Sequence, residues 1–106
     1  MAGGDYVEAV LAVVERIPPG RVMAYGMIAE YLGAGGPRQV GTVLARYGGS
    51  VGWHRVVNAA GRVAPGHETE ALRQLRAEHT PLRGDRVHMA AAAWWPDDDR
   101  RADSGP

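Results

Sequence analysis

Hydrophobic residues recur at helical spacing in four segments of the chain, and each segment ends near a proline or glycine. The first segment predicts a helix over residues 5–17, with Asp5 as the N-cap and Glu8 completing a capping box. Because proline cannot continue a helix interior, the prolines that follow residue 17 end it. The positions expected to face the core are Val7, Val10, Leu11 and Val14.

The next two segments predict short helices over residues 25–33 and 37–48, separated by a glycine-rich turn. Gly33 ends the first, Pro37 suits the first turn of the second, and Gly48 is its expected C-terminal cap. Two short helices joined by such a turn are typical of a helix-turn-helix, whose second helix enters a groove of DNA. The expected core positions are Ile28, Ala29 and Leu32, then Val40, Val43, Leu44 and Tyr47.

The opposite face of the 37–48 helix has an unusual composition. It carries Arg38, Gly41, Thr42 and Ala45, where a solvated face normally carries long charged side chains. A glycine inside a helix costs about 1 kcal/mol relative to alanine, so a close neighbour is expected to justify it. That neighbour is either another helix or a nucleic acid, and the pattern alone leaves both interpretations open.

The remaining chain predicts a strand over residues 51–57, a turn at 58–61, a fourth helix over about 68–79 and a last short strand or extended segment at 86–90. In the fourth helix Ala71, Leu72 and Leu75 should face inward. No repeat or long linker divides the chain, so we expect a single domain over residues 1–92. Residues 93–106 should form a C-terminal tail, mobile at its acidic end, whose Trp94 and Trp95 can dock on the domain.

Composition narrows the possible chemistry. The chain has no cysteine, which excludes disulfides, thiolate metal sites and a cysteine nucleophile. His67, His79 and His88 lack ligand-like spacing to acidic residues, so neither a metal nor another cofactor is expected. No apolar run approaches the roughly 20 residues of a membrane helix. The N-terminus does not resemble a secretion signal, and we expect a cytoplasmic protein.

Charge is distributed unevenly although the formal net charge is zero. Residues 97–106 hold four Asp and two Arg and contribute −2, which leaves +2 on residues 1–96. All twelve basic residues are arginine, which suits bidentate and stacking contacts better than lysine. The net charge of zero therefore does not exclude a partner that carries phosphate groups.

Three motifs occur in a specific order: IPPGRVMAYGMIAEYLG at 17–33, PRQVG at 37–41 and WHRVVN at 53–58. Together they resemble the C-terminal, DNA-binding domain of the O6-alkylguanine-DNA alkyltransferases, over residues 5 to about 90. In that family the third motif reads Pro-Cys-His-Arg-Val, and the cysteine accepts the alkyl group. Here Gly52 and Trp53 stand at the Pro and Cys positions, and tryptophan in place of cysteine is typical of the alkyltransferase-like proteins. The implied fold class is mainly α with short strands, a winged-helix-like helix-turn-helix domain.

The resemblance also implies roles for individual residues. Arg38 matches the arginine that fills the space left by a flipped-out base, and Tyr25 matches the tyrosine that rotates the target nucleotide. Gly41, Thr42 and Ala45 match the small face of a helix that lies in the minor groove, and Gln39 belongs to the same DNA-contacting set. Trp53 and the backbone of Val56 are expected to line the base pocket. His54 and Glu78 match the residues that activate the cysteine in true alkyltransferases, so here they are expected to be a structural remnant.

The loop after the third motif departs from the alkyltransferases. Residues 58–70 (NAAGRVAPGHETE) lack the Gly/Ser-rich pattern of the transferases and a clear counterpart of a basic residue that some alkyltransferase-like proteins place beside the alkylated base. The residue of this loop that contacts the alkyl group is therefore left unassigned.

The implied function is a non-enzymatic, monomeric sensor of O6-alkylguanine in double-stranded DNA. It would bend the DNA, flip the lesion and hand it to nucleotide excision repair proteins of the UvrA damage-recognition type, associated with the nucleoid while bound. Two alternatives stay open. One is a sequence-specific helix-turn-helix regulator, although the small face of the 37–48 helix lacks long polar side chains to read bases. The other is a hydrolase or dealkylase that uses His54 and Glu78.

Overall fold

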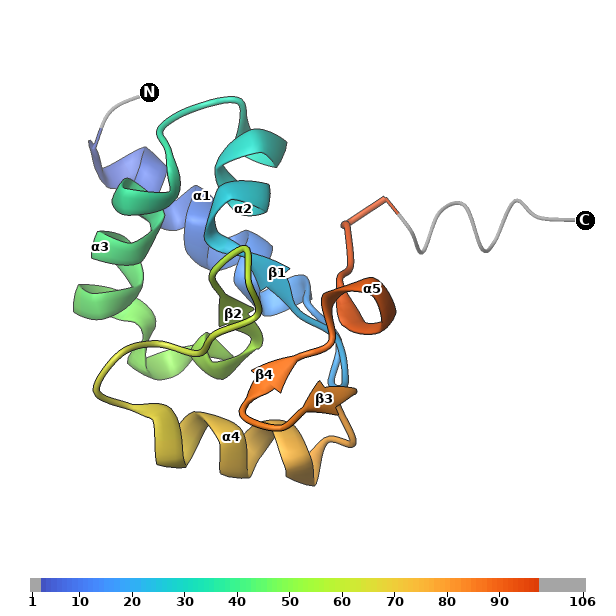
Figure 1. Cartoon of the computed structure of the whole chain (residues 1–106). Helices are drawn as coiled ribbons and strands as arrows, with labels where there is room; N and C mark the ends of the chain where they lie inside the picture. Colours follow the sequence, from blue (N-terminus) through green and yellow to red (C-terminus); the bar gives the residue numbers. More distant parts are fainter. Residues whose placement is uncertain (1–2, 98–106) are drawn as a thin grey trace, which may run out of the picture.

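The structure, a computed structural model, describes residues 3–97 and is mainly helical with short strands, which confirms the predicted fold class. The helices are α1 (Gly3–Arg16), α2 (Tyr25–Leu32), α3 (Pro37–Tyr47), α4 (Glu68–Ala77) and α5 (Met89–Ala92), with 3-10 turns η1 (Gly48–Ser50) and η2 (Trp53–Arg55). The strands are β1 (Met23–Ala24), β2 (Val56–Val57), β3 (Leu82–Arg83) and β4 (Arg86–Val87). Helices α1, α2 and α3 pack together, and α4 lies beneath them beside the β3–β4 hairpin (Figure 1).

The helix-turn-helix is present at the predicted residues. Gly33 ends α2 in the left-handed conformation, with φ 67°, and its N–H bonds to carbonyls of the last turn. Pro37 opens α3, and Gly48 follows its last residue. The prediction for α1 is wrong in one respect. Its helix already starts at Gly3, so Asp5 lies inside the first turn, where the helix dipole favours an acidic side chain, and is not the N-cap.

The predicted strand at 51–57 is largely wrong, because within it only Val56 and Val57 form a paired strand. The backbone N–H groups of Trp53 and Arg55 bond to the carbonyls of Val51 and Gly52, which coils this segment into the 3-10 turn η2. The segment expected as a connector at 21–24 supplies the partner strand. Met23 pairs with Val56 and Ala24 with Val57 in parallel register, a pairing that local patterns do not reveal.

The segment that follows α4 also differs from the prediction. The expected extended segment at 86–90 is strand only over β4, which pairs antiparallel with β3, and the chain then enters α5. Trp94 is 1% exposed within the core shared with α1, α2 and α3, and its backbone N–H donates to the Val22 carbonyl at 2.9 Å. Trp94 of the expected C-terminal tail thus docks in the core of the domain, and the boundary at residue 92 stays a prediction. The end of the acidic segment, residues 98–106, lies outside the described residues.

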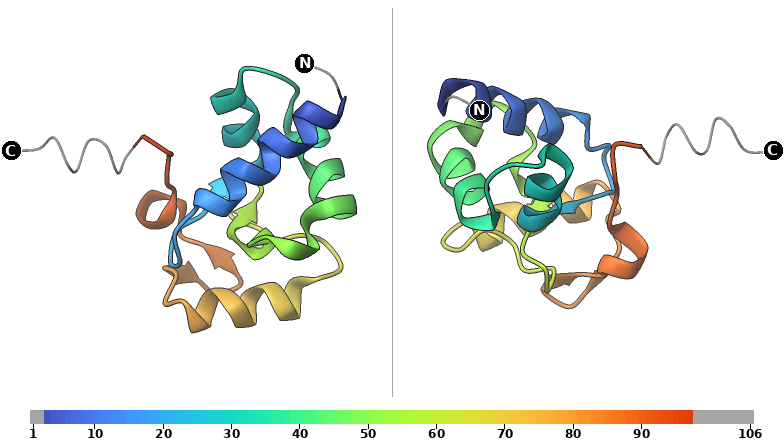
Figure 2. Two further views of the ribbon diagram at one scale, coloured as in Figure 1. Left: turned by 180° about the vertical axis from the view of Figure 1, so that it is seen from behind. Right: turned by 90° about the horizontal axis from the view of Figure 1, so that it is seen from above.

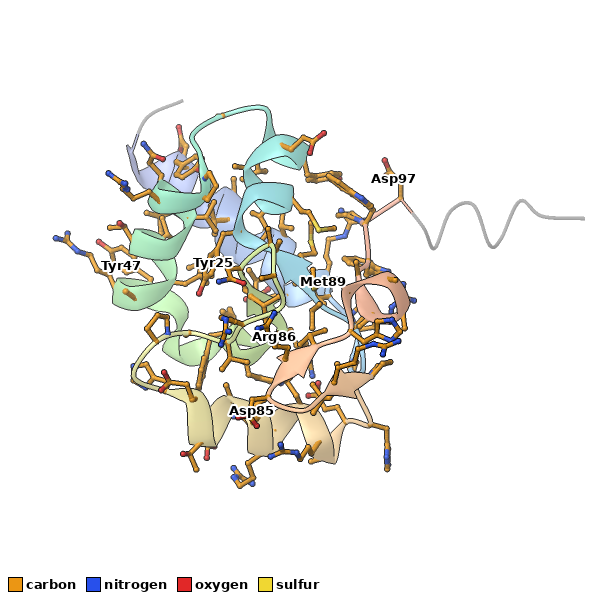
Figure 3. The ribbon with its side chains drawn as sticks, viewed as in Figure 1. Tyr25, Tyr47, Asp85, Arg86, Met89 and Asp97 are labelled. Atoms are coloured by element: carbon orange, nitrogen blue, oxygen red, sulfur yellow. The ribbon has the colours of Figure 1, made fainter. Side chains whose placement is uncertain are left out.

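Two apolar clusters support the functional surface. The first lies among α1, α2 and α3, and the second joins β2, α4 and β4. Helix α1 packs against the back of the helix-turn-helix as seen in Figure 1, so it crosses in front of α2 and α3 in the view from behind (Figure 2, left). In α1, Val13 is buried while the predicted Val7 and Leu11 are only partly buried. Tyr47, predicted as core, is 49% exposed in the last turn of α3 (Figure 3).

Candidate nucleic-acid interface

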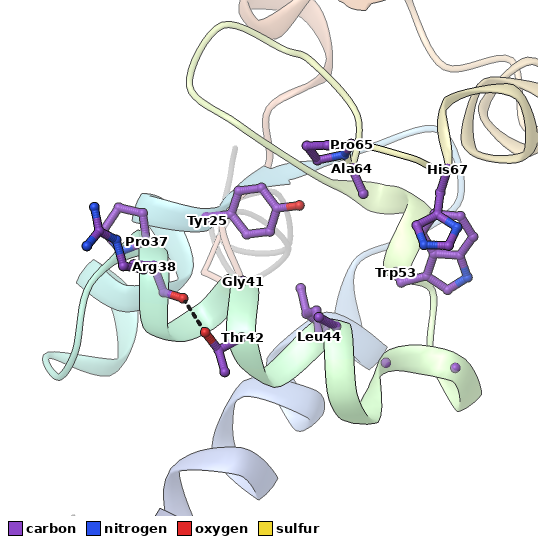
Figure 4. Close-up of a pocket in the computed structure, with 13 residues that line it drawn as sticks. Tyr25, Pro37, Arg38, Gly41, Thr42, Leu44, Trp53, Ala64, Pro65 and His67 are labelled. Atoms are coloured by element: carbon purple, nitrogen blue, oxygen red, sulfur yellow. Dashed lines mark hydrogen bonds between the residues drawn. The ribbon is translucent and has the colours of Figure 1, made fainter.

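A cavity of about 700 Å³ opens between α3 and the loop that precedes α4 (Figure 4). It takes residues from the start of α2, from one face of α3 and its C-terminal cap, from η2, and from the loop 64–67. Six of the residues predicted to bind DNA line it: Tyr25, Arg38, Gly41, Thr42, Ala45 and Trp53. Three segments that are distant in sequence therefore meet where the motifs predicted a single site.

Among residues 3–97, no neighbour comes close enough to the small face of α3 to explain its glycine. A Cβ atom placed on Gly41 would come no closer than 4.0 Å to another group, the Tyr25 ring carbon Cε1. Close packing against another helix, one of the two interpretations left open by the pattern, is therefore wrong. Thr42 and Ala45 are exposed on the same face. The Thr42 hydroxyl donates to the Arg38 carbonyl at 3.0 Å, so α3 itself satisfies this polar group.

Arg38 is exposed in the first turn of α3. Within residues 3–97 its guanidinium has no ion-pair or hydrogen-bond partner, and only its backbone carbonyl is engaged. A cation at this end of a helix faces the positive end of the helix dipole, so the position adds nothing to the stability of the helix. Such an unpaired arginine at the edge of a cavity is well placed to contact an anionic partner.

Tyr25 begins α2, and its ring projects into the middle of the cavity, between α3 and the loop residues Ala64 and Pro65 (Figure 4). The ring is half-buried, and this burial raises the pKa of the Tyr25 phenol. The phenol therefore stays protonated at neutral pH and offers an O–H donor to whatever occupies the cavity.

Trp53 closes the end of the cavity away from Arg38 (Figure 4). The His54 ring meets the indole edge-on, with ring centres 6.1 Å apart and planes at 89°, and the His67 ring lies 5.7 Å away at 66°. The backbone turn of η2 and these two rings fix the indole as part of the wall. An indole has a flat face and one N–H donor but no nucleophilic atom, so this wall can stack and cannot accept an alkyl group in the way a thiolate does.

His54, Arg55 and Glu78 form a compact cluster behind that wall. The Glu78 carboxylate accepts from His54 Nε2 at 2.9 Å and from Arg55 at 2.6 and 3.0 Å, while Arg55 also donates to the Ile17 carbonyl at 3.0 Å. Burial opposes ionisation of Glu78, but the hydrogen bonds from Arg55 and His54 outweigh it and lower the Glu78 pKa to about 2. The cluster joins the end of α1, η2 and α4.

The cluster does not line the cavity. The predicted pairing of His54 with Glu78 is present in the structure. Sequence reasoning missed Arg55, although it stands inside the WHRVVN motif. The signal was a cation directly beside a histidine already paired with an acid.

Two residues of the predicted DNA-contacting set lie elsewhere. The Gln39 side chain accepts the Gly36 N–H at 3.0 Å and so caps its own helix. Val56 is 1% exposed in the core, and neither residue lines the cavity. Sequence reasoning missed several lining residues: Pro37, Leu44, Gly48, Gly49, Ala64, Pro65 and His67. Most of them come from non-periodic segments, which carry no pattern that would mark them.

The loop that supplies Ala64, Pro65 and His67 is anchored at its base. The Asn58 side-chain oxygen accepts the N–H groups of Ala60 and Arg62, each at 2.9 Å, and the Val87 N–H donates to the Gly61 carbonyl at 2.9 Å. Gly61 has φ 84°, and a Cβ atom there would collide with the Val87 carbonyl oxygen. Only glycine tolerates both this positive φ and the close approach of Val87. Strand β4 therefore holds this wall of the cavity in place.

Other kinds of site receive no support from the part of the chain that the structure describes. Among residues 3–97, no three His, Asp or Glu side chains are grouped as a metal site requires. None of the described helices is long and apolar enough to cross a membrane.

Comparison with known proteins gives several relatives. The family model described as the DNA binding domain of 6-O-methylguanine DNA methyltransferase matches residues 5–80. The DNA base-flipping protein of Escherichia coli (strain K12) is 39% identical over 87 residues, which cover 76% of this chain and 66% of that protein. The DNA base-flipping protein of Vibrio parahaemolyticus serotype O3:K6 (strain AQ3810) is 35% identical over 63 residues, covering 57% of this chain and 63% of that protein. The match thus spans slightly less than two thirds of either relative.

Two solved structures share the fold. The crystal structure of S. pombe Atl1 in complex with damaged DNA containing O6-carboxymethylguanine has a TM-score of 0.79 and 27% identity, and covers 91% of this chain and 100% of that one. The structure of S. pombe ATL in complex with DNA gives a TM-score of 0.78 with the same identity and coverage. Since the family model spans most of the chain and the fold agrees over nearly all of it, the chain belongs to the family of the 6-O-methylguanine DNA methyltransferase DNA-binding domain, as an alkyltransferase-like protein.

Proposed function

We propose that the protein is a non-enzymatic sensor of O6-alkylguanine in double-stranded DNA. The observation that carries this proposal is Trp53, which forms the end wall of a cavity bordered by the exposed small face of α3. The cavity volume of about 700 Å³ is ample for a base with a substituent. The names of the relatives agree with this function, because one is a DNA base-flipping protein and another was crystallised with damaged DNA.

In the proposed complex α3 enters the minor groove through Gly41, Thr42 and Ala45. Their short side chains let the helix backbone approach the sugar-phosphate chains closely. The unpaired Arg38 guanidinium then enters the duplex and occupies the space left by the extruded nucleotide. Extrusion costs a few kcal/mol in lost stacking and pairing, and less at a weakened pair, which favours damaged sites. Insertion from the minor groove bends the duplex.

The extruded base lies between Tyr25 and Trp53. Stacking of a base on an aromatic side chain contributes about 1–3 kcal/mol, which helps to offset the cost of extrusion. The protonated Tyr25 phenol supplies a donor for the polar edge of the base. The chain has no cysteine, so no thiolate accepts the alkyl group and the lesion stays chemically unchanged.

An unrepaired lesion held in a bent duplex needs a second activity to remove it. We propose that the complex, with the protein as a monomer in the cytoplasm, recruits nucleotide excision repair proteins of the UvrA damage-recognition type. The resemblance to the alkyltransferase-like proteins supports this step. Co-migration of a purified UvrA-type protein with the lesion complex, and its absence with an unmodified duplex, would test the recruitment separately from lesion binding.

The decisive experiment compares binding of the purified protein to two labelled duplexes that differ only in one guanine or O6-methylguanine, followed by mass analysis of the DNA. We expect tighter binding to the lesion and an unchanged mass. Equal affinity for both duplexes would favour a sequence-specific regulator instead. Loss of the methyl mass would favour a dealkylase that uses His54 and Glu78.

A further inference from the structure

The two ends of the cavity differ in charge. Arg38 lies at one end, while Trp53 and His67 lie together at the other, on the far side of Tyr25 (Figure 4). The side chains between them are small or apolar, namely Leu44, Ala64 and Pro65. Among the described residues that line the cavity, the side chains with ionisable groups are Tyr25, Arg38 and His67, and none is a carboxylate. The Trp53 end therefore has aromatic surface but no fixed charge.

His67 is held rigidly at this end although its ring is exposed. The backbone N–H of His67 donates to the Ala64 carbonyl at 3.2 Å, and its backbone carbonyl accepts the Ala71 N–H at 3.0 Å at the start of α4. Its ring packs at 66° to the Trp53 indole, with centres 5.7 Å apart. Among the described residues none forms a hydrogen bond with the ring nitrogens of His67. The imidazole thus presents an aromatic surface and a free polar edge to the cavity.

We propose that His67 and Trp53 form a subsite that selects O6 substituents by charge, favouring uncharged aromatic and aliphatic groups over anionic ones. This inference rests on the proposed function of the same cavity. An aromatic substituent such as benzyl buries apolar surface and packs edge-on or offset against two rings, which are favourable geometries. A carboxylate in the same place loses hydration and meets no permanent cation, which is unfavourable. His67 is thus the residue of the unassigned loop that contacts the substituent.

The proposal sets this chain apart from the crystallised S. pombe relative, whose DNA contains O6-carboxymethylguanine. The test measures dissociation constants for four matched duplexes that carry guanine, O6-methylguanine, O6-benzylguanine or O6-carboxymethylguanine. We expect the wild-type protein to bind the benzyl duplex at least about tenfold more tightly than the carboxymethyl duplex, because only the latter buries an unpaired charge.

Substitution of His67 separates charge from shape. His67→Arg places a permanent cation in the subsite and should lower the benzyl-to-carboxymethyl selectivity at least about fivefold, since a buried carboxylate then gains a partner. His67→Ala should weaken benzyl binding by about threefold to tenfold, the range of one aromatic contact, and leave methyl binding nearly unchanged. Thr69→Arg is the matched control, because Thr69 is an exposed residue of the same turn that does not line the cavity. Thr69→Arg should change the affinity for all four duplexes by the same factor.

The outcomes distinguish this inference from the proposed function. If the wild-type protein binds all three lesions equally, or prefers carboxymethyl, while still rejecting unmodified guanine, the charge selectivity is wrong and lesion sensing stands. The same holds if His67→Arg leaves the selectivity ratio unchanged. If unmodified guanine binds as tightly as every lesion, the proposed function itself fails.

Discussion

The cluster behind Trp53 and the small face of α3 differ in how their charged groups are satisfied. In the cluster of His54, Arg55 and Glu78, charges are largely buried and paired, and they join three elements. On the small face of α3, Arg38 is unpaired and Gly41 lowers helix propensity, and among residues 3–97 no group packs closely against Gly41. By resemblance to the alkyltransferases, His54 and Glu78 match residues that serve catalysis there. We infer that in this chain the cluster contributes to stability, while the exposed small face of α3 serves the proposed binding.

The strongest test of this division is Glu78→Gln. The substitution removes the charge that Arg55 and His54 share, and breaking a buried pair typically costs about 3–5 kcal/mol. Because Arg55 and Glu78 remain 18% and 17% exposed, we expect a loss near the lower end of that range. The melting temperature should fall by roughly 10–20 °C for a domain of this size. Differential scanning calorimetry measures this, and a shift below the scatter of surface variants would contradict the structural role.

The same cluster predicts how stability depends on pH. The Glu78 pKa is lowered from 4.5 to about 2 in the folded protein, so the folded state binds fewer protons between these values. Its contribution is therefore fully present above about pH 5 and is lost as the pH falls toward about 2, and it amounts to about 3 kcal/mol. Urea unfolding of wild type and Glu78→Gln across this range should show converging stabilities. Parallel curves would mean that another group controls acid unfolding.

On the other side of the comparison, Arg38→Ala should affect binding and not stability. Loss of an arginine that enters the duplex should cost about 2 kcal/mol or more of lesion affinity, as for a central contact residue. The change in unfolding free energy should stay within about 0.5 kcal/mol, since Arg38 is exposed and unpaired. Arg46→Ala is the control, because Arg46 is exposed on the same helix but does not line the cavity. Equal losses of lesion affinity in the two variants would mean that Arg38 only contacts phosphate groups and does not enter the duplex.

The smallest expected effect is that of Gly41→Ala, which should change stability and DNA binding in opposite directions. Gly41→Ala should stabilise the free protein by about 0.5–1 kcal/mol, because alanine is the better helix former and its Cβ meets nothing closer than 4.0 Å. The same methyl group should weaken DNA binding if α3 presses its backbone against the duplex. Thermal unfolding and a binding titration on one preparation give both numbers. If Gly41→Ala is more stable and binds DNA with unchanged affinity, the α3 backbone does not approach the duplex closely.

The success of sequence reasoning depended on whether a signal was local. The helix-turn-helix was predictable because periodicity, Pro37, Gly33 and Gly48 all act within a few residues. The coiling of η2 and the pairing of β1 with β2 were not, since both depend on contacts between distant segments. The candidate site divides in the same way. Six lining residues were predicted from the motifs and from the small face of α3, whereas His67 enters only because its loop is anchored against β4.

Tyr47 illustrates the remaining kind of error. Its spacing from Val40 and Val43 in α3 is that of a buried residue, yet in the last turn of the helix Tyr47 is 49% exposed. Periodicity shows which side of a helix is apolar. It does not show how far along the helix the neighbouring elements reach, because that length is set by the packing of α1 and α2.

The three tryptophans of this chain have different surroundings: Trp94 is 1% exposed in the core, Trp95 packs at 6.4 Å from the Tyr31 ring, and Trp53 borders the cavity. The intrinsic fluorescence of the protein therefore contains separable signals. Emission from Trp53 should be quenched when a base stacks on it, whereas emission from Trp94 should respond to unfolding. Subtracting the spectrum of a Trp53→Phe variant would isolate the first signal, so the unlabelled protein can itself report in real time when an extruded base arrives.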